Sequence, residues 1–298
     1  MTDQPAPQRS FWRKIWEFPL VALIVALVLA MLCAAAVSVF NAQLLQPKIA
    51  EPWPTIISSI GIVVLSIAVY KLAIRKLGAK KHDDLPFGPA LKDTALGFAG
   101  GGVLISICVG LAALTGVYTI SGEGQGTDLV MIVFVAGIYA GFFEELLLRG
   151  IVFRWLEEML GSWIALALSS LMFGFLHAGN DNATFFSSLA ISIEAGILLG
   201  AAYMLTRNLW LAIGLHAGWN VIQGLWDVPI SGNDVDGLVQ ARLEGPEVLA
   251  GGGFGLEATI FALVVATGAG IWMLVRAARA GRIVKPMWSR KGNPITAY

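Results

Sequence analysis

Long apolar segments recur along the whole 298-residue chain and restrict it to a membrane fold. Hydrophobic residues make up 57% of the sequence, charged residues make up 13%, and the mean hydropathy is +0.74. Ordinary soluble domains carry about twice that share of charged residues. A run of about 20 apolar residues crosses the hydrocarbon core as a helix, so the sequence predicts an all-α, polytopic transmembrane bundle of about eight spans. The predicted spans are 18–41, 55–77, 92–118, 128–158, 162–178, 184–206, 209–225 and 256–278.

The overall charge and the cysteines exclude several other classes of protein. The formal net charge is zero, which gives no sign of a nucleic-acid partner, and the expected surroundings are membrane lipid. Cys33 and Cys108 both lie inside apolar runs, where they are expected to be small buried side chains rather than a disulfide or a thiolate metal site. Since no internal repeat or domain boundary stands out, residues 1–298 are predicted to form a single membrane domain.

The distribution of basic residues predicts the orientation of the chain. Arg9, Arg13 and Lys14 precede the first apolar run, as in a signal peptide, but the run is longer than a usual signal core and no cleavage site follows. We therefore expect a retained span. With the N-terminus in the cytoplasm, the outer connections contain only Lys48 and Arg242 among the basic residues. The predicted location is the plasma (inner) membrane, multi-pass, with both termini cytoplasmic.

The last outer connection, residues 226–255, is acidic and rich in glycine. The run Gly251-Gly252-Gly253-Phe254-Gly255 near its end suggests mobility. Two interpretations are open, a plain flexible connector and a lid over a cavity in the membrane.

Two adjacent carboxylates and an arginine lie inside the span 128–158. An ionised group at this depth costs roughly 2.5–3.5 kcal/mol on insertion, so such residues usually face a protein interior. Glu145 and Arg149 are four residues apart and share one helix face, whereas Glu144 is rotated by about 100° onto another. We predict that Glu145 and Arg149 form a buried ion pair and that Glu144 is free to act as a base. In the alternative, all three form an ion network that only specifies the fold.

The position of His177 can be related to that of Glu144 by counting residues. The fourth and fifth spans are expected to form a hairpin that turns at Gly161. Glu144 lies about 17 residues before this glycine and His177 about 16 residues after it, which places both at the same depth at 1.5 Å per residue. A histidine that only bonds a neighbouring helix is the simpler alternative.

The span 209–225 carries His216 and Asn220, four residues apart on one helix face. Both side chains can donate hydrogen bonds to an oxyanion that develops on a carbonyl under attack. The alternative is polar packing between helices. Three pairs of glycines at four-residue spacing are expected to let helices approach closely, and the third brackets His216. The pairs are Gly97 with Gly101, Gly196 with Gly200, and Gly214 with Gly218.

Three motifs in this order resemble the CPBP family of intramembrane proteases, also called the CAAX prenyl protease 2 or Abi family, and the compactness of the chain resembles its bacterial members. The resemblance covers about residues 128–225, which would be the catalytic core helices. The motifs are Glu144-Glu145-(three residues)-Arg149, Phe173-(three residues)-His177 and His216-(three residues)-Asn220.

The resemblance implies an intramembrane endopeptidase that hydrolyses a peptide bond of a hydrophobic or lipidated peptide or protein. Glu144 and His177 would then activate a water, and His216 and Asn220 would form an oxyanion hole. Supporting roles would fall to Glu145, Arg149 and Phe173.

The family is often described as metalloproteases, so zinc is the cofactor to consider. Glu144, His177 and His216 would supply three ligands and leave one position for water. We favour a site without metal, because Asn220 beside His216 suits a second hydrogen-bond donor better than a ligand. Two functions of other classes stay open, a non-catalytic membrane protein that binds peptides, as in bacteriocin immunity, and a proton-coupled transporter.

Overall fold

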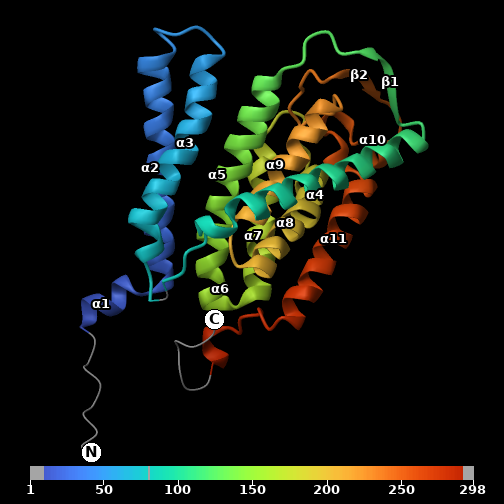
Figure 1. The fold of residues 1–298 in the computed structure, drawn as a ribbon. Helices are drawn as coiled ribbons and strands as arrows, with labels where there is room; N and C mark the ends of the chain where they lie inside the picture. The colour runs from blue at the N-terminus through green and yellow to red at the C-terminus, as the bar shows by residue number, and fades with distance from the viewer. Residues whose placement is uncertain (1–9, 80, 291–298) are drawn as a thin grey trace, which may run out of the picture.

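The computed structural model describes residues 10–79 and 81–290 and shows a bundle of tilted helices (Figure 1). Seven helical segments of the described residues are long and apolar enough to cross a membrane, which confirms the predicted all-α polytopic bundle. The protein is a multi-pass membrane protein. These segments are Pro19–Leu45, Trp53–Lys76, Phe87–Leu114, Val130–Leu160, Ser162–Gly179, Phe185–Thr206 and Ile260–Arg279.

The order of elements along the chain alternates long helices with short connections. The helices up to the middle of the chain are α1 (Phe11–Trp16), α2 (Pro19–Phe40), α3 (Trp53–Leu72), α4 (Phe87–Leu114), α5 (Gly141–Glu145) and α6 (Arg154–Leu160). Those that follow are α7 (Ser162–Leu176), α8 (Phe185–Thr206), α9 (Trp210–Leu225), α10 (Glu247–Ala250) and α11 (Ile260–Arg279). Two strands, β1 (Tyr118–Glu123) and β2 (Val239–Leu243), pair antiparallel.

The prediction of about eight spans exceeds the seven candidates by one helix, α9. The predicted span 209–225 is helical, but α9 has 16 residues and extends about 24 Å, less than the hydrocarbon thickness of about 30 Å. It packs against α4, α5, α8 and the helical segment Val130–Ala140 that precedes α5, and most of its side chains are buried. Because protein rather than lipid surrounds this helix, it can present polar residues to the interior.

Helices α4 and α9 cross at a contact made by glycines (Figure 1). A Cβ atom at Gly101 would overlap the backbone O of Leu215, and one at Gly218 would overlap the backbone O of Phe98. The close approach predicted from Gly97 with Gly101 and from Gly214 with Gly218 is therefore present in one crossing. This crossing fixes α9, and with it His216, at short distance from α4.

The segment Val130–Leu160 forms one helical rod whose middle carries the two adjacent carboxylates. Two π-helical stretches, η3 (Val130–Ala140) and η4 (Leu146–Phe153), flank α5. Wider helical turns of this kind are frequent near functional sites. The rod ends at Gly161, which has φ +81°, and α7 begins at the next residue. The predicted hairpin and its turn are confirmed.

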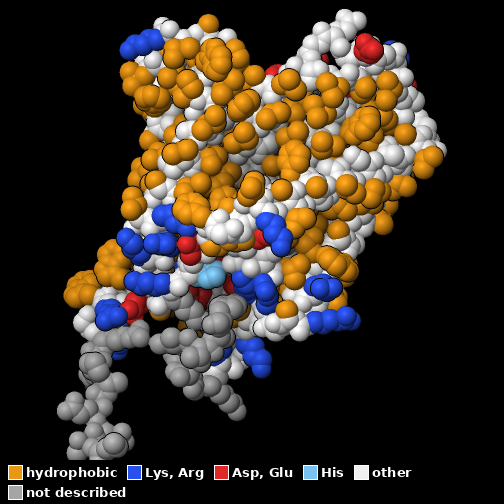
Figure 2. All heavy atoms as spheres, in the orientation of Figure 1, with side chains coloured by type: hydrophobic (Ala, Val, Ile, Leu, Met, Phe, Trp, Pro, Cys, Tyr) orange, Lys and Arg blue, Asp and Glu red, His pale blue; other side chains and the backbone are white. Residues whose placement is uncertain are grey.

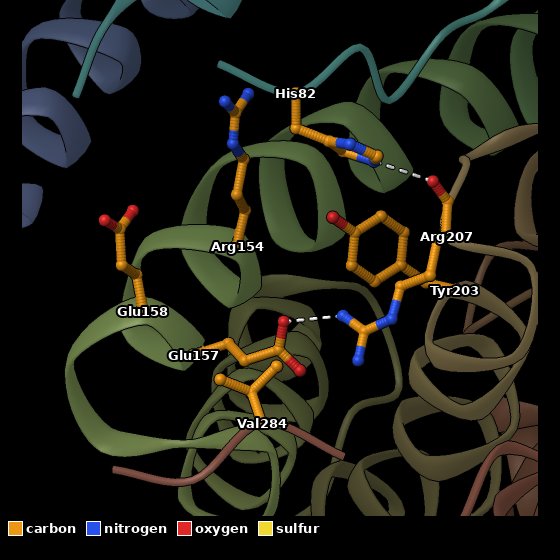
Figure 3. Close-up of a pocket in the computed structure, with 7 residues that line it drawn as sticks. All are labelled: His82, Arg154, Glu157, Glu158, Tyr203, Arg207 and Val284. Atoms are coloured by element: carbon orange, nitrogen blue, oxygen red, sulfur yellow. Dashed lines mark hydrogen bonds and ion pairs between the residues drawn. The ribbon is translucent and has the colours of Figure 1, made fainter. Parts of the chain in front are cut away.

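Buried polar contacts hold together the end of the bundle at which α6 and α8 end. Asp84, in the connection before α4, accepts hydrogen bonds from the Tyr70 and Tyr203 hydroxyls at 2.6 Å and from Arg154 at 3.0 Å. These contacts tie α3, α6 and α8 together. Beside them lies a cavity of about 60 Å³ (Figure 3), in which Arg207 is paired with Glu157 at 2.6 Å. Figure 2 shows that lysine and arginine side chains gather at this end, below a broad hydrophobic band.

The connection between α9 and α11 is folded rather than extended. It contains β2, and the Asp227 carboxylate accepts hydrogen bonds from the backbone N–H groups of Gly237 and Ala241 at 2.8 Å. A Cβ atom at Gly232 would overlap the backbone O of Asp181, in the connection before α8. Glycine therefore permits close packing at this position.

We predict that Gly101→Ala destabilises the protein by about 1–3 kcal/mol, because the new methyl group forces α4 away from the Leu215 backbone. The measurement is the free energy of unfolding in mixed micelles. Gly110→Ala is the control on the same helix, since a Cβ atom at Gly110 would meet nothing within 4 Å. Equal stability of the two variants would show that the glycine crossing carries no packing constraint.

Candidate active site

A buried ion pair forms the centre of the site. Arg149 Nη1 lies 2.8 Å from Glu145 Oε1, and both side chains are 0% exposed, as the sequence predicts. The same Glu145 oxygen lies 3.0 Å from Nδ1 of His216 on α9. Glu145 therefore links α5 to α9, through a contact between residues that are 71 positions apart in the chain.

Arg149 extends this connection to α7 and α8. Its Nη2 donates to the backbone O of Ala195 at 3.4 Å and of Gly196 at 3.3 Å. Its guanidinium lies over the Phe173 ring, 4.5 Å from the ring centroid. Both contacts suit a delocalised cation that is enclosed by protein. The pair thus holds the helices that carry Phe173, His177 and His216.

Glu144 points away from this pair and toward His177. Its Oε2 lies 3.8 Å from His177 Nε2, so the predicted match in depth is confirmed. The Glu144 side chain is 30% exposed and that of His177 is 12% exposed, in contrast to the enclosed Glu145. A separation of 3.8 Å is too long for a direct hydrogen bond and suits a water molecule that bonds both groups.

The backbone fixes the protonation of the His177 ring. Nδ1 of His177 lies 2.7 Å from the backbone O of Phe173. A carbonyl oxygen only accepts, so Nδ1 carries the hydrogen. In the neutral ring, Nε2 therefore presents a lone pair toward Glu144. This is the tautomer that can accept a hydrogen bond from a water.

Phe173 separates the two imidazoles. Its ring centroid is 4.9 Å from that of His177 and 5.7 Å from that of His216. Asn220 lies one turn beyond His216, and its Nδ2 donates to the backbone O of Ala136 at 3.0 Å. One N–H of the Asn220 amide is used in this contact, and the second N–H is available for another acceptor.

His216 and Asn220 share a small cavity with two further acids that we did not predict from the sequence. The cavity has a volume of about 20 Å³ and is lined by Phe173, His216, Asn220, Glu194, Ser231 and Glu257 among others. Glu194 is 1% exposed and Glu257 is 3% exposed. Glu194 lies within the predicted span 184–206, so the cost of a carboxylate at membrane depth was the signal that would have found it.

The three zinc ligands considered from the sequence are not assembled as a metal site. Among residues 10–79 and 81–290, no group of three or more histidine, cysteine, aspartate or glutamate side chains is placed to hold a metal ion. His216 directs Nδ1 to Glu145, whereas Glu144 faces His177. The donor set therefore does not fit zinc in this arrangement.

Comparison with known proteins agrees with the motif-based expectation. The family described as type II CAAX prenyl endopeptidase Rce1-like matches residues 126–222, about a third of the chain. This segment runs from just before η3 to α9 and includes all three motifs. No curated protein and no solved structure matches the chain. Residues 126–222 thus resemble an Rce1-like domain, and this resemblance supports protease activity within a membrane.

We predict that Glu145→Ala lowers the free energy of unfolding by about 3–5 kcal/mol, because it leaves Arg149 buried without its carboxylate. Glu144→Ala is the matched control one residue away, on a side chain that is 30% exposed, and should change stability by less than about 1 kcal/mol. Unfolding of both variants in the same micelles makes the comparison. If Glu144→Ala is the more damaging variant, the two carboxylates have the reverse roles.

Proposed function

We propose that the chain is an intramembrane endopeptidase that hydrolyses a peptide bond of a hydrophobic or lipidated peptide or protein. The observation that carries this proposal is the placement of the Glu144 carboxylate 3.8 Å from His177 Nε2, beside the buried Glu145–His216 contact. A base, an imidazole lone pair and hydrogen-bond donors are the groups that amide hydrolysis requires.

In the proposed mechanism, a water bound between Glu144 and His177 attacks the substrate carbonyl. His177 Nε2 accepts one hydrogen bond from this water and orients it, while Glu144 removes the other proton. The resulting hydroxide adds to the carbonyl carbon and forms a tetrahedral oxyanion. When the C–N bond breaks, the proton on Glu144 passes to the leaving amine, so the carboxylate is regenerated.

The oxyanion is proposed to accept hydrogen bonds from His216 Nε2 and from the second N–H of Asn220. Donors that are fixed before the reaction stabilise this charge without reorganisation, and removal of one such donor costs about 3–4 kcal/mol of transition-state stabilisation in other enzymes. The contacts of His216 to Glu145 and of Asn220 to Ala136 support this role, since each holds its side chain in place. Glu145, Arg149 and Phe173 have positioning roles.

We further propose that the protein lies in the plasma (inner) membrane with its basic end in the cytoplasm. The gathering of lysine and arginine at this end of the bundle, with Lys71 in the last turn of α3 and Arg276 and Arg279 in the last turn of α11, supports this orientation (Figure 2). Lys80 and Lys291, which also count as inner residues, lie outside the described part of the chain.

We predict that Glu144→Gln abolishes cleavage of a hydrophobic or lipidated peptide, by at least about 100-fold, because the amide cannot take the proton of the water. His177→Ala should have a similar effect, since the water loses its second partner. Product formation is measured with purified protein in lipid, and peptide binding is measured in parallel.

A protein that only binds and sequesters peptides would have no turnover in the wild type and unchanged affinity in Glu144→Gln. Turnover in the wild type that persists in Glu144→Gln would rule out the proposed base.

We predict that exhaustive chelation leaves cleavage unchanged, because no step of the mechanism passes through a metal ion. The measurement is the rate before and after chelation, with the metal content of the sample determined at the same time. Loss of activity that added zinc restores would favour the alternative in which Glu144, His177 and His216 bind zinc.

A further inference from the structure

Two enclosed carboxyl groups, Glu194 and Glu257, face the cavity that also holds His216 and Asn220. Glu194 projects from α8, and Glu257 lies in the short turn η7 (Leu256–Ala258) just before α11. The proposed hydrolysis uses neither of them directly. Since burial of a carboxyl group has a cost, the protonation states of this pair need a physical explanation.

The surroundings of the two carboxyl groups differ. Glu257 Oε2 accepts a hydrogen bond from the backbone N–H of Ser231 at 2.6 Å, which favours its ionised form. Glu194 Oε2 is buried and has no hydrogen-bond partner among the described residues. A buried carboxylate without a partner takes up a proton. We assign the proton to Glu194 and the negative charge to Glu257, and the cavity of about 20 Å³ has room for one water between them.

His216 needs a nearby negative charge if it is to donate to an oxyanion. Its Nδ1 lies against Glu145, whose carboxylate can only accept, so Nδ1 carries a hydrogen. A neutral ring would then present a lone pair at Nε2 and repel an oxyanion. Donation from Nε2 therefore requires the imidazolium form, with a hydrogen on both nitrogens.

The charges of the groups around Glu194 and Glu257 favour one additional positive charge. Glu194, His216 and Glu257 are the titratable groups that line the cavity. The titratable and charged groups that interact with them from neighbouring elements are Cys108 on α4, Glu144 and Glu145 on α5, Arg149 on η4 and His177 after α7. Arg149 balances Glu145. The proposed mechanism uses His177 in its neutral form, so His216 is the imidazole that can carry a positive charge beside Glu144 and Glu257. Burial raises the pKa of the Glu257 carboxyl above its usual value, and the hydrogen bond from the Ser231 N–H and a positive His216 oppose this rise. The negative charge of Glu257 and a positive His216 therefore stabilise each other.

We propose that Glu257 is a positioning residue of the active site, whose carboxylate, beside a protonated Glu194, keeps His216 in the imidazolium form that donates to the oxyanion. The proposal rests on the proposed function, because it explains how His216 can act as a donor. It assigns a role in the site to the segment between α9 and α11, which supplies both Glu257 and its partner Ser231. It also predicts different effects of substituting the two buried acids. Glu194→Gln replaces a protonated carboxyl group without a change of charge, whereas Glu257→Gln removes a negative charge.

The direct test is a pH titration of the histidine rings by nuclear magnetic resonance. The sequence contains three histidines, so protein labelled with ¹⁵N-histidine gives three pairs of ring signals, and His216→Gln identifies those of His216. In the wild type and in Glu194→Gln, His216 should stay protonated at a pH where free histidine is neutral. In Glu257→Gln, it should lose its proton about one pH unit lower or more, because one nearby negative charge is missing.

Glu257→Gln keeps an oxygen that accepts from Ser231, so the fold should be retained. Glu244→Gln removes an exposed acid from the same segment and should leave the titration unchanged. A His216 titration that is equal in wild type and Glu257→Gln would overturn the proposal. So would an equal shift in Glu194→Gln, or a shift of His177 alone.

Kinetics give a second readout. Activity requires protonated His216, so the alkaline limb of the kcat profile should move to lower pH in Glu257→Gln by the same amount as the titration, and the limb should not move in Glu194→Gln. A change in kcat at all pH values without movement of the limb would indicate a structural role only. If the wild type cleaves no peptide, the proposed function fails, but the titration still decides the ionisation of His216.

Discussion

The Glu145–Arg149 ion pair is the interaction on which the arrangement of the other site residues depends. Each ionised group at this depth would cost several kcal/mol if it faced lipid, so the pair must be enclosed by protein. The enclosure consists of the Phe173 ring, the backbone oxygens of Ala195 and Gly196, and His216. Because these groups belong to α7, α8 and α9, satisfying one buried charge pair positions three helices.

The pair also separates the roles of two neighbouring carboxylates. Glu145 is fully enclosed and accepts from both Arg149 and His216, whereas Glu144 is partly exposed and lies 3.8 Å from His177. One carboxylate holds the helices, and the other is the group that we propose for proton transfer. The glycine crossing of α4 and α9 completes the arrangement, since it brings the polar face of a short helix into the bundle.

Local spacing predicted those features that depend on a single helix or on one hairpin. The four-residue spacing of Glu145 and Arg149 gave the ion pair, and the turn at Gly161 gave the common depth of Glu144 and His177. Contacts between helices distant in sequence were not predictable in this way. The contact of His216 with Glu145 and the role of Asp84 both require knowledge of which helices are neighbours.

Composition was a weaker guide than spacing. Composition predicts mobility for the glycine-rich connection between α9 and α11, but it did not reveal the close packing of its backbone or the pairing of β2 with β1. The prediction of about eight spans includes α9, which has 16 residues, is too short to be among the seven candidate spans and is enclosed by protein. Hydropathy does not distinguish such a helix from one that faces lipid. Glu194 and Glu257 were not predicted as site residues, because neither lies within one of the three motifs.

The central claim is that water, activated by Glu144 and His177, attacks the peptide bond without a covalent intermediate. A single turnover in water enriched in ¹⁸O tests this claim, with the products and the protein weighed by mass spectrometry during the reaction. One ¹⁸O atom should enter the new carboxyl terminus of the peptide, and the protein mass should stay constant throughout. A transient gain in protein mass equal to the acyl part of the substrate would mean that a side chain, rather than water, makes the first attack.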